Sequence, residues 1–227
     1  MRTLRGVPFL AAVLTAVSLT TPGPATAATD GSGHCTRQER VRVPGAALQR
    51  TACLDDLTTT GLAGTPYTDL ADQAGLTADG TRAPSGIPGV QVDGYFPDSS
   101  RFNNTHGWRH DAQFVIRLPD DWNGGLVVTG APGTRKQYAT DKAISDRVLA
   151  QGYAYAATDK GNNGTDFYRD GVRPGDAVAE WNARTTQLTR AARRVAAQRY
   201  GHAPRRTYIA GISNGGYLTR WQLENHP

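Results

Sequence analysis

The segment Tyr208–Gly216 constrains the fold of this chain more than any other stretch. A short run that favours β-structure leads into Gly211, a serine follows two residues later, and Tyr217–Asn225 then has the composition of a helix. A G-x-S-x-G pattern between a strand and a helix places the serine on a sharp turn, where a base can reach its hydroxyl from one side and a substrate from the other. The sequence therefore predicts that Ser213 is a nucleophile.

The residues next to Ser213 suit such a turn. Gly211 and Gly215 lack the Cβ atoms that would clash where a strand and a helix pack closely, and Gly216 extends the same run of small residues. The backbone N–H of Asn214 stands at the start of the following helix, so it is expected to point toward the place where an oxyanion forms. We therefore expect Asn214 to be one oxyanion donor.

Apolar strands and amphipathic helices alternate from residue 125 onward. The predicted strands are Gly125–Gly130, Tyr153–Thr158 and Thr207–Ala210, and the predicted helices are Thr140–Gln151 and a long one that Asp176 caps and that ends at Tyr200. This alternation is typical of right-handed crossovers in a parallel sheet with helices on both faces. Such sheets carry their chemistry at the carboxyl ends of the strands, where Ser213 lies.

Gln91–Phe96 alternates between apolar and polar residues, and Gln113–Leu118 is a second strand-like run that Pro119 ends. Together they predict an antiparallel hairpin. The fold class is therefore α/β, with this hairpin followed by parallel strands, in a domain that covers residues 90–227. Residues 28–89 contain recurring proline and glycine and predict an irregular segment, with a short helix around Thr68–Ala74.

Residues 1–27 have the three parts of a secretory signal peptide. Arg2 and Arg5 precede an apolar run, Val7–Leu19, and the small residues Ala25-Thr26-Ala27 follow it. The apolar run is too short to span a bilayer. We expect cleavage near Ala28 and a secreted product that has no contact with the membrane afterwards.

The chain has two cysteines, Cys35 and Cys53. In an oxidising compartment such an isolated pair predicts a disulfide that pins the irregular segment, with a stabilisation of roughly 3 kcal/mol. A metal site is not expected, because His34 is the one histidine nearby and it lacks a partner at ligand spacing. The sequence predicts no cofactor.

The charge of the chain gives no indication of a nucleic-acid partner. Arg2 and Arg5 lie in the predicted signal peptide, so its removal lowers the formal charge from +5 to +3. The arginines that cluster between residues 184 and 206 are typical of the solvated face of a helix and the loop after it. The sequence leaves the oligomeric state open.

The order of these elements and two of their motifs resemble the first half of an α/β-hydrolase. The motifs are Thr129-Gly130-Ala131-Pro132-Gly133 and Gly211–Gly216. The loop Ala157–Gly164 is similar to the loop after the fourth strand in the tannase and feruloyl esterase group, and Ser-Asn-Gly-Gly also occurs in polyester-oligomer hydrolases and prolyl-oligopeptidase-like peptidases. The tannase pattern has a cysteine directly before the nucleophile, where this chain has Ile212.

The resemblance implies that Ser213 attacks a small-molecule or oligomeric carboxylic ester and that the N–H of Asn214 holds the oxyanion. It implies a second donor in the loop after Gly130. Because Pro132 has no N–H, this donor is Ala131 or Gly133, and Ala131 is favoured because it directly follows the strand. Asp159, at the carboxyl end of a strand, is a candidate for substrate binding.

In this superfamily the acid and the histidine of the triad follow the nucleophile on later strands. Fourteen residues follow Ser213, and their acid and histidine, Glu224 and His226, are expected on a helix that points away from the hydroxyl. The other histidines, at positions 34, 106, 110 and 202, precede the nucleophile. We therefore expect this chain to be an amino-terminal fragment of a secreted serine esterase, inactive on its own.

Two other interpretations stay open. The first is a serine peptidase of the prolyl-oligopeptidase type, which a β-propeller repeat before residue 90 would favour, and the sequence shows no such repeat. The second is a non-catalytic remnant of the hydrolase fold or a binding module, which the lack of a suitable acid and histidine would favour.

Overall fold

The computed structural model describes residues 41–97, 112–161 and 177–226. The expected signal peptide, Cys35, the histidines at 34, 106 and 110 and the cap at Asp176 lie outside these residues. None of the helices in the described ranges is both long enough and apolar enough to cross a bilayer.

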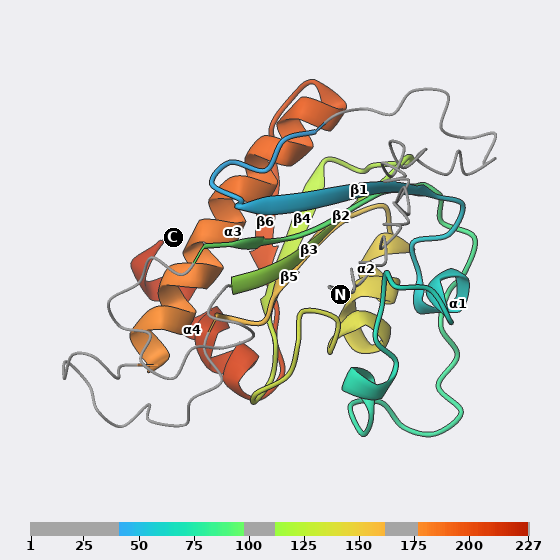
Figure 1. The fold of residues 1–227 in the computed structure, drawn as a ribbon, viewed down its shortest axis with the longest axis horizontal. Helices are drawn as coiled ribbons and strands as arrows, with labels where there is room; N and C mark the ends of the chain where they lie inside the picture. Colours follow the sequence, from blue (N-terminus) through green and yellow to red (C-terminus); the bar gives the residue numbers. More distant parts are fainter. Residues whose placement is uncertain (1–40, 98–111, 162–176, 227) are drawn as a thin grey trace, which may run out of the picture. The chain divides into compact units, whose positions relative to one another are not determined.

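Six strands form one mixed sheet in the order β1-β2-β3-β5-β4-β6 (Figure 1). Their bounds are Leu48–Leu54 for β1, Gly89–Phe96 for β2, Ala112–Pro119 for β3, Gly125–Gly130 for β4, Ala154–Thr158 for β5 and Arg206–Ile209 for β6. The strands β1, β2, β3 and β5 pair antiparallel in that order, whereas β4 runs parallel to both β5 and β6. The predicted hairpin and the predicted parallel strands are therefore confirmed.

The strand β1 corrects the expectation that residues 28–89 are irregular. It pairs with the whole length of β2, from Leu48 opposite Tyr95 to Leu54 opposite Gly89. Part of the supposed preamble thus belongs to the sheet, and a domain boundary at residue 89 would cut through it. Backbone pairing with β2 holds this edge strand in the sheet. Because most of its residues are exposed or half-buried, its sequence has no strong apolar pattern.

Helices cover both faces of the sheet (Figure 1). The long helix α3, Ala177–Tyr200, packs on one face, where its buried residues Leu188, Ala192 and Val195 meet apolar side chains of β2 to β5. The other face packs against the short helix α2, Asp146–Leu149, through Leu149. A strand covered on both sides must be apolar on both sides, which explains why β4 and β5 are fully buried.

The predicted helix Thr140–Gln151 is interrupted. Residues Asp141–Ser145 form a π-helical turn, in which the carbonyl of Thr140 accepts hydrogen bonds from the N–H groups of both Ile144 and Ser145, and α2 begins only after this turn. The wider turn brings Asp141 and Ser145 onto the guanidinium of Arg117 in β3. Periodicity does not reveal such a turn, because its cause is a tertiary contact with a buried cation.

Arg117 is fully buried and forms the centre of a polar cluster between the sheet and this turn. Its two terminal nitrogens donate to the two carboxylate oxygens of Asp141 at 2.6 and 2.7 Å, and its Nε donates to Gln91 at 2.8 Å. Asp141 also accepts a hydrogen bond from the hydroxyl of Thr68 at 2.8 Å. The Nη2 of Arg117 also donates to the backbone carbonyl of Tyr67 at 3.3 Å. The cluster therefore connects the segment after β1 to the centre of the sheet. In that segment the expected short helix is a 3-10 turn, Ala71–Gln73.

Candidate active site

Ser213 stands between the end of β6 and the start of α4, Asn214–Asn225. Its side chain is exposed, and its backbone has φ 55° and ψ −122°. A non-glycine residue with these angles is strained, by about 1–3 kcal/mol, and such strain persists only where the surrounding structure imposes it. Because β6 lies parallel to β4, the carboxyl ends of both strands and the loop after β4 meet beside Ser213.

Two glycines make this sharp turn possible by close backbone contacts. A Cβ atom on Gly211 would lie 2.2 Å from the carbonyl of Gly215, and a Cβ atom on Gly215 would lie 2.5 Å from the carbonyl oxygen of Gly130. No side chain fits at either distance. Gly216 is different, because its nearest such atom, the carbonyl oxygen of Gly211, would be at 3.5 Å, an ordinary contact.

The N–H of Asn214 lies at the amino end of α4, next to Ser213. The N–H groups of Gly215 and Gly216 donate to the carbonyls of Ile212 and Ser213, at 2.9 and 2.8 Å, whereas that of Asn214 donates to no group within the described residues. A free N–H at a helix amino terminus, where the helix dipole is positive, suits an anion. Asn214 thus lies where the sequence analysis expects a donor.

The N–H of Ala131 is not available as the second donor. It donates to the carbonyl of Thr158 in β5 at 2.9 Å and so continues the pairing of β4 with β5. The alternative, Gly133, has φ +53°, and its N–H has no acceptor within the described ranges. The structure therefore favours Gly133 over Ala131, because the sheet extends one residue beyond the end of the apolar run.

Asp159 is placed where it braces a loop. Its Oδ1 accepts hydrogen bonds from the backbone N–H groups of Gln113, at 3.0 Å, and Gly161, at 2.8 Å, and the residue is 3% exposed. Burial raises the pKa of Asp159 to about 7, against the lowering effect of these two hydrogen bonds. Its Oδ2 is buried and has no hydrogen-bond partner among the described residues, so contact of Asp159 with a substrate stays a prediction.

No sequence motif gives Lys160 a role, yet the structure places it beside the loop after β4. Its ammonium is buried and donates to the carbonyl oxygens of Ala131 and Gly133. Burial lowers the pKa of Lys160 to about 8, so the group is still protonated at neutral pH. The sequence gives no reason to expect this burial, because a lysine in a polar loop is usually a surface residue.

No acid or histidine of the described residues hydrogen-bonds to Ser213. His226 is exposed, follows α4 and lies edge-on against Trp221, while Glu224 pairs with Arg220 on the outer surface of the same helix. His202 lies near Trp122 after the end of α3. Within the same ranges no cluster of His, Cys, Asp and Glu could hold a metal ion.

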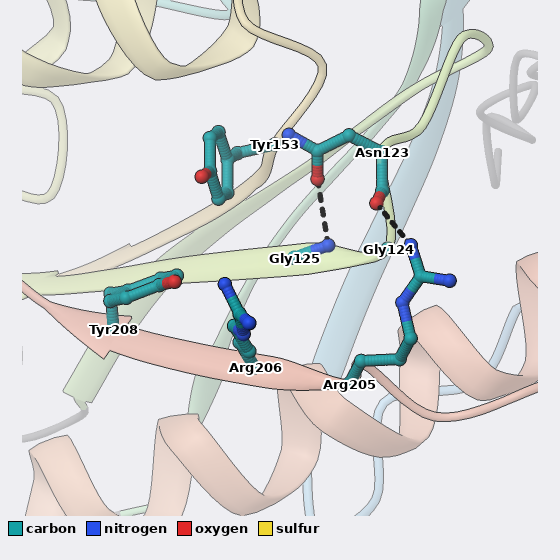
Figure 2. Close-up of a pocket in the computed structure, with 7 residues that line it drawn as sticks. All are labelled: Asn123, Gly124, Gly125, Tyr153, Arg205, Arg206 and Tyr208. Carbon is teal, nitrogen blue, oxygen red and sulfur yellow. Dashed lines mark hydrogen bonds between the residues drawn. The ribbon is translucent and has the colours of Figure 1, made fainter.

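A separate pocket of about 380 Å³ lies at the opposite end of the sheet (Figure 2). Figure 2 shows Asn123 beside Arg205, the residue before β6. The Oδ1 of Asn123 accepts from the N–H of Gly125 and its backbone carbonyl accepts from Arg205, while its side-chain amide donates to the carbonyl of Gln151. These residues stand at the amino ends of β4 and β6, whereas Ser213 follows the carboxyl end of β6. The pocket is therefore not part of the candidate active site.

A family model described as tannase and feruloyl esterase matches residues 102–221, which is more than half of the chain. No curated protein matches the chain.

Similar solved structures include an esterase and feruloyl esterase B, both from Aspergillus oryzae, and a tannin acyl hydrolase from Aspergillus niger. Their sequence identities are 15%, 16% and 16%, and their TM-scores are 0.51, 0.50 and 0.50. The matches cover 81%, 80% and 78% of this chain but only 32%, 32% and 30% of those structures, so the chain spans about a third of their length. At such identities these structures support the fold, and the family model carries the assignment: the chain belongs to the tannase and feruloyl esterase family.

Proposed function

We propose that this chain carries the nucleophile and the oxyanion hole of a secreted serine esterase. Ser213 attacks the ester carbonyl, and the N–H groups of Asn214 and Gly133 hold the oxyanion. The observation that carries the proposal is the backbone of Ser213. This exposed serine is held at φ 55° between two glycines that have no room for a Cβ atom, and backbone strain of this kind is concentrated at functional sites.

The reaction proceeds through an acyl-enzyme. As Ser213 Oγ forms a bond to the carbonyl carbon, its proton passes to a base, and the alcohol then leaves with that proton as its bond to the carbonyl carbon breaks. Water next attacks the acyl-enzyme, releases the carboxylic acid and restores the hydroxyl. The two N–H groups stabilise the negative oxygen in both steps.

The base and its orienting acid are proposed to lie outside these 227 residues. Support comes from the described residues, in which no acid or imidazole hydrogen-bonds to Ser213, and in which His226 contacts Trp221 and Glu224 pairs with Arg220. The solved structures that share the fold are about three times as long as the matched region, which leaves room for both groups.

The proposed substrates are carboxylic esters of the kind that the family description names, tannins and feruloyl esters. We propose that residues 1–27 are a signal peptide that directs export of the protein, and that the mature protein has a disulfide between Cys35 and Cys53. This position of Cys53 is compatible with a link to the preceding segment, because Cys53 lies near the end of β1, an edge strand of the sheet.

The test is to express the complete reading frame that encodes this sequence and to measure hydrolysis of methyl gallate, methyl ferulate and p-nitrophenyl acetate. Ser213→Ala should lower kcat at least about 1000-fold, because the nucleophile is lost. Ser85→Ala makes the same change at an exposed serine and should leave the rate as it is. Hydrolysis of these esters that survives Ser213→Ala would refute the proposal.

A further inference from the structure

Lys160 occupies an unusual position for a lysine. It is completely buried at the carboxyl end of β5 and has φ 73°, a backbone conformation that non-glycine residues rarely adopt. Its backbone N–H donates to the hydroxyl of Thr158 at 3.1 Å, and its ammonium lies 5.1 Å from the centre of the Trp181 ring. A buried ammonium is expensive unless it is hydrogen-bonded, so its partners show what the position requires.

The partners of the ammonium are two backbone carbonyls of the loop after β4. Nζ donates to the carbonyl oxygen of Ala131 and, at 2.9 Å, to that of Gly133. The carbonyl between them, that of Pro132, accepts from the N–H of Arg135 at 3.2 Å. Three successive carbonyls of this loop are therefore fixed, two of them by the same side chain.

These contacts determine where the N–H of Gly133 points. A peptide group is planar and trans, so the N–H of Gly133 points opposite to the carbonyl of Pro132. Lys160 fixes the peptide groups on both sides of this one, and the N–H between them has no acceptor within the described residues. An oxyanion donor has to be aimed before the reaction, because its benefit depends on preorganisation.

We propose that Lys160 is a positioning residue, which aims the N–H of Gly133 at the oxyanion by holding the carbonyls of Ala131 and Gly133. This inference extends the proposed function. It adds a residue to the same site that the G-x-S-x-G motif does not reveal.

Lys160 does not act as the base that Ser213 needs. An ammonium has three donors and no acceptor, and two of its donors are directed at carbonyl oxygens. The structure has no hydrogen bond between Lys160 and Ser213. A role as proton acceptor would require the lysine to lose its proton and both carbonyl contacts.

The first test needs no catalytic activity. Amide hydrogen exchange is compared between the complete protein and its Lys160→Met variant, which keeps the apolar stem and removes the ammonium. The amide of Ala131, which donates to Thr158, should exchange at least about 10-fold faster in the variant, because the loop that follows it is released. The amide of Ala210, which donates to Val128 beside the Ser213 turn, should be unchanged. An unchanged Ala131 amide would overturn the proposal.

The second test separates positioning from a merely structural role. Lys160→Met should lower kcat for ester hydrolysis about 10- to 100-fold and change KM less than about 3-fold, because the donor acts on the transition state. Lys142→Met is the matched control, since its ammonium has no hydrogen bond or ion pair within the described part of the chain. An unchanged kcat, or a loss that appears in KM alone, would contradict the proposal.

The two tests also separate this proposal from the proposed function. If the unmodified protein shows no hydrolysis that depends on Ser213, the esterase proposal fails, and the exchange of the Ala131 amide still decides whether Lys160 holds the loop. If hydrolysis depends on Ser213 but not on Lys160, the esterase proposal stands and the role of Lys160 is refuted.

Discussion

The backbone of Ser213 carries the most specific information at the scale of single residues. Its φ and ψ values fall in a region that favours glycine, so the turn stores strain that a Cβ atom causes. Removing the Cβ atom should therefore stabilise the fold although it removes the proposed nucleophile. The fold would therefore be more stable with glycine at this position, whereas the proposed reaction needs the serine hydroxyl.

We expect Ser213→Gly to raise the free energy of unfolding by about 1 kcal/mol, which is the relief of strain less the greater freedom of glycine in the unfolded chain. Ser213→Ala is the matched control, because alanine keeps the Cβ atom and should bring no such gain. Urea unfolding of the three proteins measures both effects. Equal stabilities of the glycine and alanine variants would show that the turn is not strained.

Asp159 should make the stability of the protein depend on pH. Burial raises its pKa to about 7, well above the value of about 4 in an unfolded chain, so the folded state binds a proton that the unfolded state releases between pH 4 and pH 7. The contribution of Asp159 to stability is therefore present below pH 4 and is lost as the pH rises to 7. The size of this loss is up to about 4 kcal/mol, since one pKa unit corresponds to about 1.4 kcal/mol.

Asp159→Asn keeps an oxygen that can accept from Gln113 and Gly161 and cannot ionise, so it should remove this part of the pH dependence. Its unfolding free energy relative to that of the unmodified protein should rise between pH 4 and pH 7. Asp79→Asn makes the same change at an exposed position and should leave the pH profile as it is. Parallel profiles for the Asp159 variant and the unmodified protein would contradict the account.

At the scale of elements, the cluster around Arg117 joins β3, the π-helical turn and the segment after β1. Arg117→Met should lower the free energy of unfolding by about 3–5 kcal/mol, because it leaves the buried carboxylate of Asp141 without its cation. Arg220→Met breaks an exposed pair with Glu224 and should have little effect. Urea unfolding measures both, and similar midpoints for the two variants would argue against a structural role of the cluster.

Elements with a strong apolar signature could be predicted from the sequence, and those held by tertiary contacts could not. β4 and β5 were predictable because burial on both faces demands an unbroken apolar run. The largely unburied β1 was missed because its place in the sheet depends on pairing with β2, and the π-helical turn was missed because Arg117 causes it.

The candidate site shows the same division. Ser213 and Asn214 follow from a local pattern, whereas the choice between Ala131 and Gly133 depends on how far β4 remains paired with β5. The proposed role of Lys160 depends on the path of the loop after β4, because its partners Ala131 and Gly133 lie more than 20 residues before it in the sequence. Such contacts are set by the assembled sheet and cannot be inferred from spacing.

At the scale of the whole molecule, the described residues form a sheet that ends at β6, and they bring Ser213, Asn214 and Gly133 to the carboxyl ends of its parallel strands. The chain spans about a third of the length of the similar solved structures, and the family to which it belongs is named for ester hydrolysis. We propose that Ser213 is acylated during the hydrolysis of these esters.

Labelling of the complete protein with a fluorophosphonate, followed by tryptic mass spectrometry, tests this claim most directly. Ser213 is the one serine in the tryptic peptide Thr207–Arg220, so the site of the adduct is unambiguous. We expect one adduct, on this peptide, and none in the Ser213→Ala variant. A protein that hydrolyses esters while this peptide stays unlabelled, or that carries its adduct on another peptide, would contradict the assignment of Ser213 as the nucleophile.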